Sequence, residues 1–287
     1  MRLGLVVNNY GAPATEAVRR MPVLAEEWGY DSIWVTDHVV GVRSFQPVYG
    51  ATWMEPMMAL AWMAAMTSRI RLGMGVLVVP YRDPVLTAKM VATLDQLSGG
   101  RVNLGVGTGW ARREYQALGR VDLFDARGSV TNESLDVMLR CWQGGEFDFE
   151  GKHFQFRRIQ FDPVPIQQPR VPLWIGSRTG QGAPMRRVAQ YADVWHPTGL
   201  TPEEVQESGA AVDDVAGREI PRTIRLAHGL GQTTAELIDL LSRYREAGCI
   251  EAAVSFGGGD PDLAQTGALE GVLEAAQALA EHRGEIG

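Results

Sequence analysis

The sequence is poor in cysteine and in lysine, and each shortage excludes a class of protein. Its two cysteines, Cys141 and Cys249, form no disulfide framework and show no metal-ligand spacing, which favours a reducing, cytoplasmic setting. The only lysines, Lys89 and Lys152, fall in an expected helix and hairpin, whereas a Schiff-base aldolase needs a lysine at a strand end. The histidines lack H-x-x-x-H and H-E-x-x-H spacing, and no G-x-S-x-G motif occurs. We therefore expect neither a metal site nor a serine hydrolase.

Long basic runs and long apolar runs are also missing. The net charge is −7, so nucleic acid and anionic membrane surfaces are not expected partners. No stretch approaches the roughly 18–20 apolar residues that span a bilayer. The chain starts at once with a strand-like segment and shows no secretory leader. These features predict a cytoplasmic protein with a small-molecule ligand.

Eight strand–helix units follow one another through all 287 residues without a dividing linker. The expected strands are Leu3–Asn8, Ser32–Thr36, Ile70–Val79, Arg101–Val106, Val171–Ile175, Asp193–His196, Thr223–Ala227 and Glu251–Phe256. The expected helices are Thr15–Trp28, Glu55–Thr67, Pro84–Leu97, Arg112–Leu118 with Ser129–Trp142, Gly182–Tyr191, Pro202–Val215, Thr234–Ala247 and Asp262–His282. Apolar strands alternating with amphipathic helices indicate a parallel sheet covered by helices. Eight units favour closure into a single-domain (β/α)₈ TIM barrel, with an open doubly wound sheet as the alternative.

One segment interrupts this alternation. Residues Phe147–Phe149 and His153–Phe156 alternate in polarity around Gly151. They predict a small hairpin inserted before the fifth strand.

In a barrel of this kind, ligands bind where strands pass into the following helices. Two consecutive strands end in glycine-rich loops that could receive a phosphate or allow close approach of a ligand. The residues concerned are Gly107, Thr108, Gly109 and Trp110 after the fourth strand, and Gly176, Ser177, Arg178, Thr179 and Gly180 after the fifth. Tight turns without a ligand are the alternative interpretation, and the glycine spacing departs from a nicotinamide fingerprint.

Other strand ends carry a histidine and several aromatic residues. His38 follows the second strand beside Asp37, where it could exchange a proton with a ligand, although a lone histidine is often structural. Tyr10, Tyr49 and Trp53 could wall a planar ring and its substrate, or they could simply pack. Glu55 falls in the same set of loops.

Four segments resemble the bacterial luciferase-like superfamily, most closely its coenzyme F420-dependent oxidoreductases. They are "AEEWGYDSIWVTDHV", "RIRLGMGVLVVPYRDPVLTAKMVATLDQLSGGRVNLGVGTGW", "EYQALG" and "VPLWIGSRTGQGAPMRRVAQYADVWHPTG". The resemblance implies a barrel that is usually dimeric. It places a non-proline cis peptide at Gly75-Val76 behind the cofactor ring and His38 as the active-site histidine near that ring. It assigns the two glycine loops to the ribityl chain and phosphate, and with Asp37 these residues make up the predicted cofactor site.

The sequence departs from the deazaflavin-dependent sugar-phosphate dehydrogenases at one position. Those relatives carry a carboxylate directly after the fourth-strand "TG", where this chain has Trp110, so their substrate does not transfer. Glu114 lies a turn further along, and we interpret it as structural or as a loop anchor.

The predicted reaction is hydride transfer between C5 of F420 and a small organic substrate. An FMN-dependent monooxygenase and a non-catalytic cofactor-binding relative are the alternatives. Arginines near the two loops could meet the acidic tail of F420, namely Arg112, Arg113, Arg178, Arg186 and Arg187. We expect Tyr10, Phe45, Tyr49, Trp53, Glu55 and the hairpin to shape the substrate site, and we expect the chain to form a homodimer.

Overall fold

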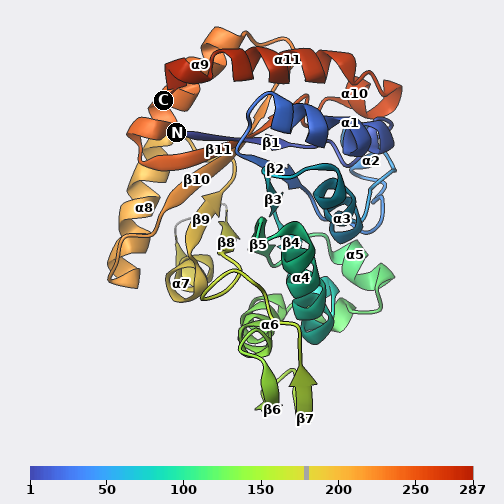
Figure 1. Cartoon of the computed structure of the whole chain (residues 1–287), viewed down its shortest axis with the longest axis vertical. Helices are drawn as coiled ribbons and strands as arrows, with labels where there is room; N and C mark the ends of the chain where they lie inside the picture. The colour runs from blue at the N-terminus through green and yellow to red at the C-terminus, as the bar shows by residue number, and fades with distance from the viewer. Residues whose placement is uncertain (178–180, 287) are drawn as a thin grey trace.

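The eight parallel strand positions close into a barrel, as a computed structural model of the chain shows (Figure 1). The structure describes residues 1–177 and 181–286. The barrel strands are β1 (Arg2–Val6), β2 (Ser32–Val35), β3 (Arg71–Met74) with β4 (Leu77–Val78), β5 (Val102–Gly107), β8 (Leu173–Ser177), β9 (Val194–Pro197), β10 (Arg222–His228) and β11 (Cys249–Phe256). Strand β1 lies between β2 and β11, and β3 also pairs with β5, so the sheet has no open edge. The barrel prediction is confirmed, and the open doubly wound sheet is excluded.

Helices surround the barrel on its outside (Figure 1). The longer ones are α1 (Ala14–Glu27), α3 (Pro56–Met66), α4 (Pro84–Ser98), α6 (Arg127–Cys141), α7 (Gly182–Tyr191), α8 (Pro202–Ala216), α9 (Thr234–Glu246) and α11 (Glu270–Glu281). Short helices are α2 (Gln46–Tyr49), α5 (Arg112–Ala117), α10 (Pro261–Thr266) and α12 (Arg283–Ile286), with 3₁₀ turns at η1 (Val79–Tyr81) and η2 (Val121–Leu123). Helix α4 shows how local sequence sets the ends, because Asp83 accepts from two first-turn amides and Gly99 takes the left-handed conformation after the last turn.

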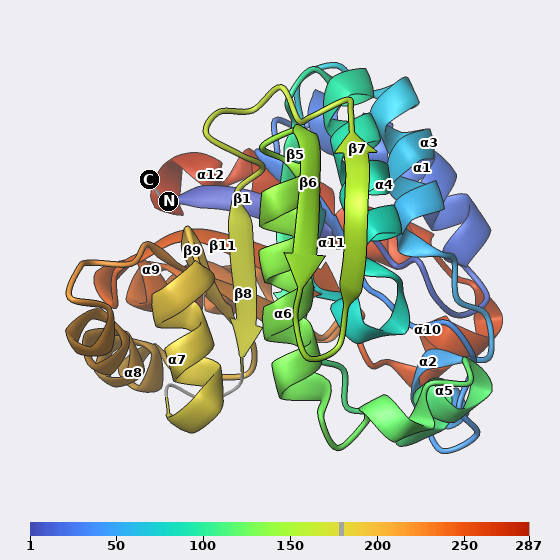
Figure 2. The same ribbon diagram turned by 90° about the horizontal axis from the view of Figure 1, so that it is seen from below.

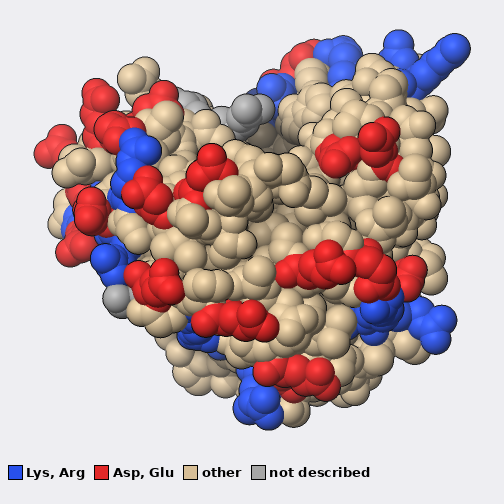
Figure 3. All heavy atoms as spheres, turned by 90° about the horizontal axis from the view of Figure 1, so that it is seen from above, with Lys and Arg blue, Asp and Glu red and all other residues tan. Residues whose placement is uncertain are grey.

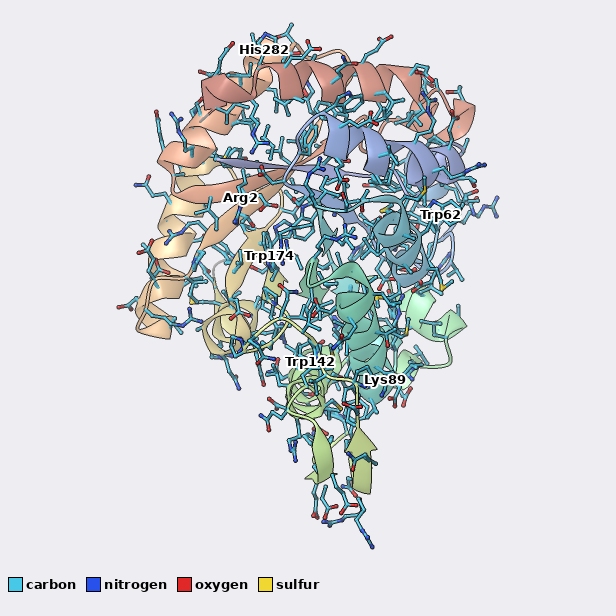
Figure 4. All side chains as sticks on the ribbon, viewed as in Figure 1. Arg2, Trp62, Lys89, Trp142, Trp174 and His282 are labelled. Carbon is cyan, nitrogen blue, oxygen red and sulfur yellow. The ribbon has the colours of Figure 1, made fainter. Side chains whose placement is uncertain are left out.

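Two tryptophans fill the middle of the barrel because glycines on neighbouring strands leave room for them. The rings of Trp34 and Trp174 are both buried, with centroids 4.7 Å apart. A Cβ on Gly73 would lie 2.2 Å from the Trp34 ring, and one on Gly4 would lie 2.6 Å from its indole nitrogen. Figure 4 shows Trp174 inside the ring of strands. This packed layer closes the barrel below the strand ends.

The third strand is broken where a single strand was expected over Ile70–Val79. Strand β3 ends at Met74, β4 resumes at Leu77, and the Gly75-Val76 peptide between them is cis. The cis peptide thus lies where the family resemblance implies it.

The closing helix is also divided, against the expectation of one helix over Asp262–His282. Gly267 has a φ of 73°, a left-handed conformation that ends α10, and α11 begins at Glu270. Glycine in the left-handed conformation commonly ends helices, because a residue without a Cβ adopts that conformation with little steric strain.

The inserted hairpin is longer than the sequence pattern indicates. It comprises β6 (Gly145–Glu150) and β7 (Gln155–Phe161), paired antiparallel. Glu133 of α6 accepts from the amides of Lys152, His153 and Phe154 at 2.7–3.0 Å, which fixes the hairpin turn to α6. Figure 2 shows the hairpin lying across α6 on the outside of the barrel.

The surface over α9 and α11 is acidic. Figure 3 shows more Asp and Glu than Lys and Arg on this face, in keeping with the net charge of −7. Such a face repels polyanions. In the described ranges, no helix has both the length and the apolarity needed to cross a membrane.

Candidate active site

The carboxyl ends of the strands enclose a cavity of about 740 Å³. That volume lies within the range of about 300–1,000 Å³ found for small-molecule sites. The predicted residues that line it are Tyr10, Asp37, His38, Phe45, Tyr49, Trp53, Gly75, Val76, Gly107, Thr108, Gly109, Trp110, Gly176, Ser177 and Arg187. Neither Glu55 nor any residue of the hairpin is part of this lining. The hairpin therefore lies outside the lining of the described cavity, and its part in the substrate site stays a prediction.

His38 stands in the cavity wall and is oriented by Glu114 of α5. Its Nδ1 lies 2.7 Å from Glu114 Oε2, and the Glu114 side chain is fully buried. The Val39 amide donates to Glu114 Oε1 at 2.7 Å, and the Tyr81 hydroxyl donates to Oε2 at 3.1 Å. The interpretation of Glu114 as a loop anchor describes its bond to Val39 but misses its bond to His38.

These contacts define which nitrogen of His38 is available. Burial acts to raise the pKa of Glu114, but hydrogen bonds from His38, Val39 and Tyr81 outweigh burial and lower that pKa. Glu114 is therefore a carboxylate at neutral pH and accepts the Nδ1 proton of His38. Nε2 has no hydrogen-bond partner among the described residues. His38 can thus exchange a proton with a bound molecule through Nε2.

Aromatic side chains form the wall next to His38. The Trp53 ring lies 4.4 Å from the His38 ring and 5.0 Å from Tyr10, and Tyr49 lies 5.4 Å from Tyr10 in an edge-on arrangement. An isolated bridge pairs the backbones of Tyr10 and Trp53, which holds this wall together. The rings present flat, largely apolar surfaces suited to a planar ligand.

Asp37 lines the cavity, but protein groups occupy its carboxylate. Arg82 donates to both oxygens at 2.6 and 3.0 Å, and the Val78 amide donates to Oδ2 at 2.8 Å. Glu55 accepts from Arg82 at 2.8 Å and also caps α3 by accepting from the Met58 amide. Asp37 and Glu55 therefore join the ends of β2 and β4 and the start of α3 through Arg82.

The strand-end glycines have a packing role that the sequence pattern does not show. A Cβ on Gly107 would lie 2.5 Å from Val76 Cγ2, and one on Gly176 would lie 2.6 Å from Val76 Cγ1. These two glycines make room for the Val76 side chain at the break in the third strand. Close approach of a ligand to these glycines stays a prediction.

The loop after β8 leads into the start of α7. Ser177 Oγ accepts from the indole nitrogen of Trp195 at 2.9 Å. Arg178, Thr179 and Gly180, three predicted cofactor residues, lie outside the described residues. Helix α7 begins at Gly182 without a side-chain cap. Arg187 lines the cavity and donates to Asn132 and to the Gly128 carbonyl, but no carboxylate pairs with it among the described residues.

Two polar residues in the cavity wall are missing from the sequence prediction. His196 of β9 is buried and stacks on Trp34 at 4.9 Å with an interplanar angle of 17°. Arg225 of β10 donates to the Gly75 carbonyl at 2.6 Å. His196 ends an expected strand, so the rule that located His38 could have found it, whereas Arg225 lies in the middle of an expected strand. Among the described residues, no cluster of His, Cys, Asp or Glu could hold a metal ion.

Curated relatives with similar sequences include both uncharacterized proteins and a monooxygenase. An uncharacterized protein of Mycobacterium tuberculosis strain H37Rv is 30% identical over 277 residues, which cover 90% of this chain and 92% of that protein. The 4-hydroxyprotoasukamycin monooxygenase of Streptomyces nodosus subsp. asukaensis is 30% identical over 251 residues, 77% of this chain and 61% of that enzyme.

Solved structures with similar folds include an F420-dependent dehydrogenase and a monooxygenase. An F420-dependent secondary alcohol dehydrogenase, in complex with an F420–acetone adduct, superposes with a TM-score of 0.77 at 17% identity, covering 96% of this chain and 98% of that one. Monooxygenase RslO1 of Streptomyces bottropensis gives a TM-score of 0.75 at 18% identity, covering 98% of both chains. The model of the family described as luciferase-like monooxygenase matches residues 4–284. The chain therefore belongs to the luciferase-like monooxygenase family, a family of barrel oxidoreductases.

Proposed function

We propose that this chain is an F420-dependent oxidoreductase that transfers a hydride between C5 of the deazaflavin and a small organic substrate. The observation that carries the proposal is the His38–Glu114 pair, an oriented acid–base group in the wall of the cavity. When bound, the deazaflavin supplies the hydride chemistry, and the protein supplies position and proton transfer. His38 Nε2 is the atom through which the proton moves.

The cavity lining offers contacts for both the ring and the phosphate of a cofactor. Gly75 and Val76, at the break in the third strand, line the part that we assign to the ring. Arg187 of α7 also lines the cavity and offers a buried positive charge that has no carboxylate partner among the described residues. Burial lowers the pKa of Arg187, and a phosphate there would offset that cost.

The exposed arginines beyond the cavity favour F420 over FMN. Arg113 on α5 and Arg186 on α7 are exposed, whereas Arg112 pairs with Asp125 at 3.1 Å. Both arginines lie on helices that follow cavity-lining loops. They can meet the acidic tail that extends from the phosphate of F420 and that FMN lacks.

An FMN-dependent monooxygenase is the second candidate. The similarity to 4-hydroxyprotoasukamycin monooxygenase favours it, as does a 35% identity over 145 residues to the pyrimidine monooxygenase RutA of a Bradyrhizobium strain. The same cavity would hold the FMN ring, ribityl chain and phosphate.

A titration of the purified protein with each cofactor separates the two candidates. We expect the dissociation constant of F420 to be at least about tenfold lower than that of FMN, because the tail adds charged contacts. Cofactor fluorescence measures both constants. Riboflavin serves as the control for ring binding without phosphate, and tighter binding of FMN would favour the monooxygenase.

We further propose that the chain pairs with a second copy through α3. The outer side of this helix has no charged residue and exposes Met58, Trp62 and Met66, at spacing i, i+4 and i+8. Figure 4 shows Trp62 on the outer side of α3. Leu86 and Leu97 of α4, the neighbouring helix, are also exposed. A contiguous apolar stripe of this kind is typical of subunit interfaces.

Substituting Trp62→Glu is expected to convert the dimer into a monomer. A charge in the centre of an apolar interface remains desolvated and unpaired, which opposes association. Light scattering coupled to gel filtration measures the mass. Val215→Glu on α8, at a site of matching exposure elsewhere on the barrel, should stay dimeric. A monomeric wild-type protein at micromolar concentration would contradict the proposal.

A further inference from the structure

Arg225 is a half-buried cation that has no carboxylate partner among the described residues. It lines the cavity, and its hydrogen bond within the described residues is the one to the Gly75 carbonyl. The groups that act on it electrostatically are the phenols of Tyr10 and Tyr49, and neither is a carboxylate. Burial lowers the pKa of Arg225, so the folded protein bears a desolvation cost that a salt bridge usually offsets. A ligand with an acidic oxygen would offset it here.

His196 beside Arg225 adds no second positive charge. Its Nδ1 lies 2.8 Å from Thr223 Oγ1, and Thr223 in turn donates to the Trp195 carbonyl at 3.2 Å. The imidazole therefore carries its proton on Nδ1, and Nε2 is an acceptor without a partner among the described residues. Burial and the nearby Arg225 lower the pKa of His196 to about 3, so it stays neutral at ordinary pH.

Arg225 lies close to the aromatic wall of the cavity. A Cβ on Gly75 would lie 3.8 Å from Arg225 Cδ and 3.5 Å from His196 Nε2, so both residues lie next to Gly75. Tyr10 and Tyr49 are close enough to act on the guanidinium. Burial raises the pKa of Tyr10, which therefore remains an uncharged phenol. This part of the cavity thus joins flat aromatic surfaces to the fixed positive charge of Arg225.

We propose that the substrate is a planar ring compound with an ionisable oxygen, a phenol or a carboxylic acid, and that Arg225 binds this oxygen. The ring lies against Tyr10, Tyr49 and Trp53. The inference rests on the proposed function only in assigning this part of the cavity to the substrate, because binding of the acid needs no cofactor. Arg225 acts in recognition, and the proton transfer of the reaction stays with His38.

The probe for this site is 4-nitrophenol, whose ionised form absorbs visible light and therefore reports its own protonation state. In the cofactor-free wild-type protein, we expect the pKa of bound 4-nitrophenol to fall below that of the free compound. We expect 4-nitroanisole, the neutral analogue with the same ring, to bind about tenfold or more weakly than the phenolate, since it lacks the charged oxygen that accepts a hydrogen bond from Arg225.

Three substitutions complete the test. Arg225→Met should abolish the preference for the phenolate, Arg225→Lys should keep most of it, and Arg158→Met on the exposed hairpin should leave it unchanged. Circular dichroism checks that each variant is folded. If Arg225→Met does not fold, the pKa of 4-nitrophenol bound to the wild-type protein decides whether the inference holds. An unshifted or raised pKa of the bound probe overturns the inference. A preference that survives in Arg225→Met overturns it as well.

The same variants separate this inference from the proposed function. If Arg225→Met weakens F420 or FMN binding about tenfold and leaves 4-nitrophenol unaffected, Arg225 belongs to the cofactor site and the inference is wrong. If the probe ionises on Arg225 but neither cofactor binds, the substrate inference holds and the proposed redox function fails.

Discussion

Substituting His38→Ala is expected to lower kcat for F420-dependent turnover by about 10²–10⁴-fold, the usual contribution of a positioned acid–base group. The reason is geometric: Nε2 of His38 has no hydrogen-bond partner among the described residues, and Glu114 fixes the ring that bears it. The loss should appear in kcat more than in the dissociation constant of F420, because the ring and phosphate contacts remain. Steady-state absorbance of F420, with a substrate turned over by the wild-type protein, measures the change.

Two controls test that interpretation. His153→Ala removes an imidazole on the outer hairpin that is hydrogen-bonded to Ser129, and it should leave kcat unchanged. Glu114→Gln keeps a hydrogen-bond acceptor for Nδ1 but removes the negative charge, so it should give a smaller loss in kcat and a shifted pH profile. Unchanged turnover in His38→Ala, with folded protein and bound cofactor, would remove His38 from the reaction.

Much of the barrel could be predicted from the sequence because its strands and helices are set by local signals. Apolar strands alternate with helices that begin at caps such as Asp83 and end at glycines such as Gly99. The place of the site followed from the same order, because ligands bind at the carboxyl ends of barrel strands. The division of the last helix at Gly267 was also visible as a glycine, but a lone glycine in a helical pattern is an ambiguous signal.

The parts that could not be predicted depend on contacts between distant segments. Glu114 and His38 are 76 residues apart, and only the folded barrel shows that their side chains meet. Likewise, Gly107 and Gly176 suggest an open phosphate loop in the sequence, whereas in the structure they accommodate Val76. The role of Arg225 could not be predicted from the sequence, because only the folded structure shows that its guanidinium has no carboxylate partner among the described residues.

The barrel glycines predict the second large effect, which is on stability. Gly105→Ala would place a Cβ 1.8 Å from the Met74 carbonyl oxygen, at the point where the third strand breaks. Both groups belong to the backbones of neighbouring barrel strands, so neither can rotate away. We expect a loss of about 3 kcal/mol or more in the free energy of unfolding, at the upper end of overpacking effects. For a chain of this size, the melting temperature should fall by about 6–12 °C.

Gly284→Ala is the matched control, because no atom outside the local helix lies within 4 Å of its Cβ position and α12 already holds it in helical conformation. Alanine there should leave the melting temperature unchanged or raise it slightly, since alanine is the better helix former. Thermal unfolding followed by circular dichroism compares the two variants. Gly105 is outside the cavity lining, so a folded Gly105→Ala protein should bind F420 nearly as the wild type does. Equal melting temperatures for Gly105→Ala and wild type would contradict this prediction. They would mean that β3 and β5 can separate at Met74 without loss of stability, although their pairing closes the barrel.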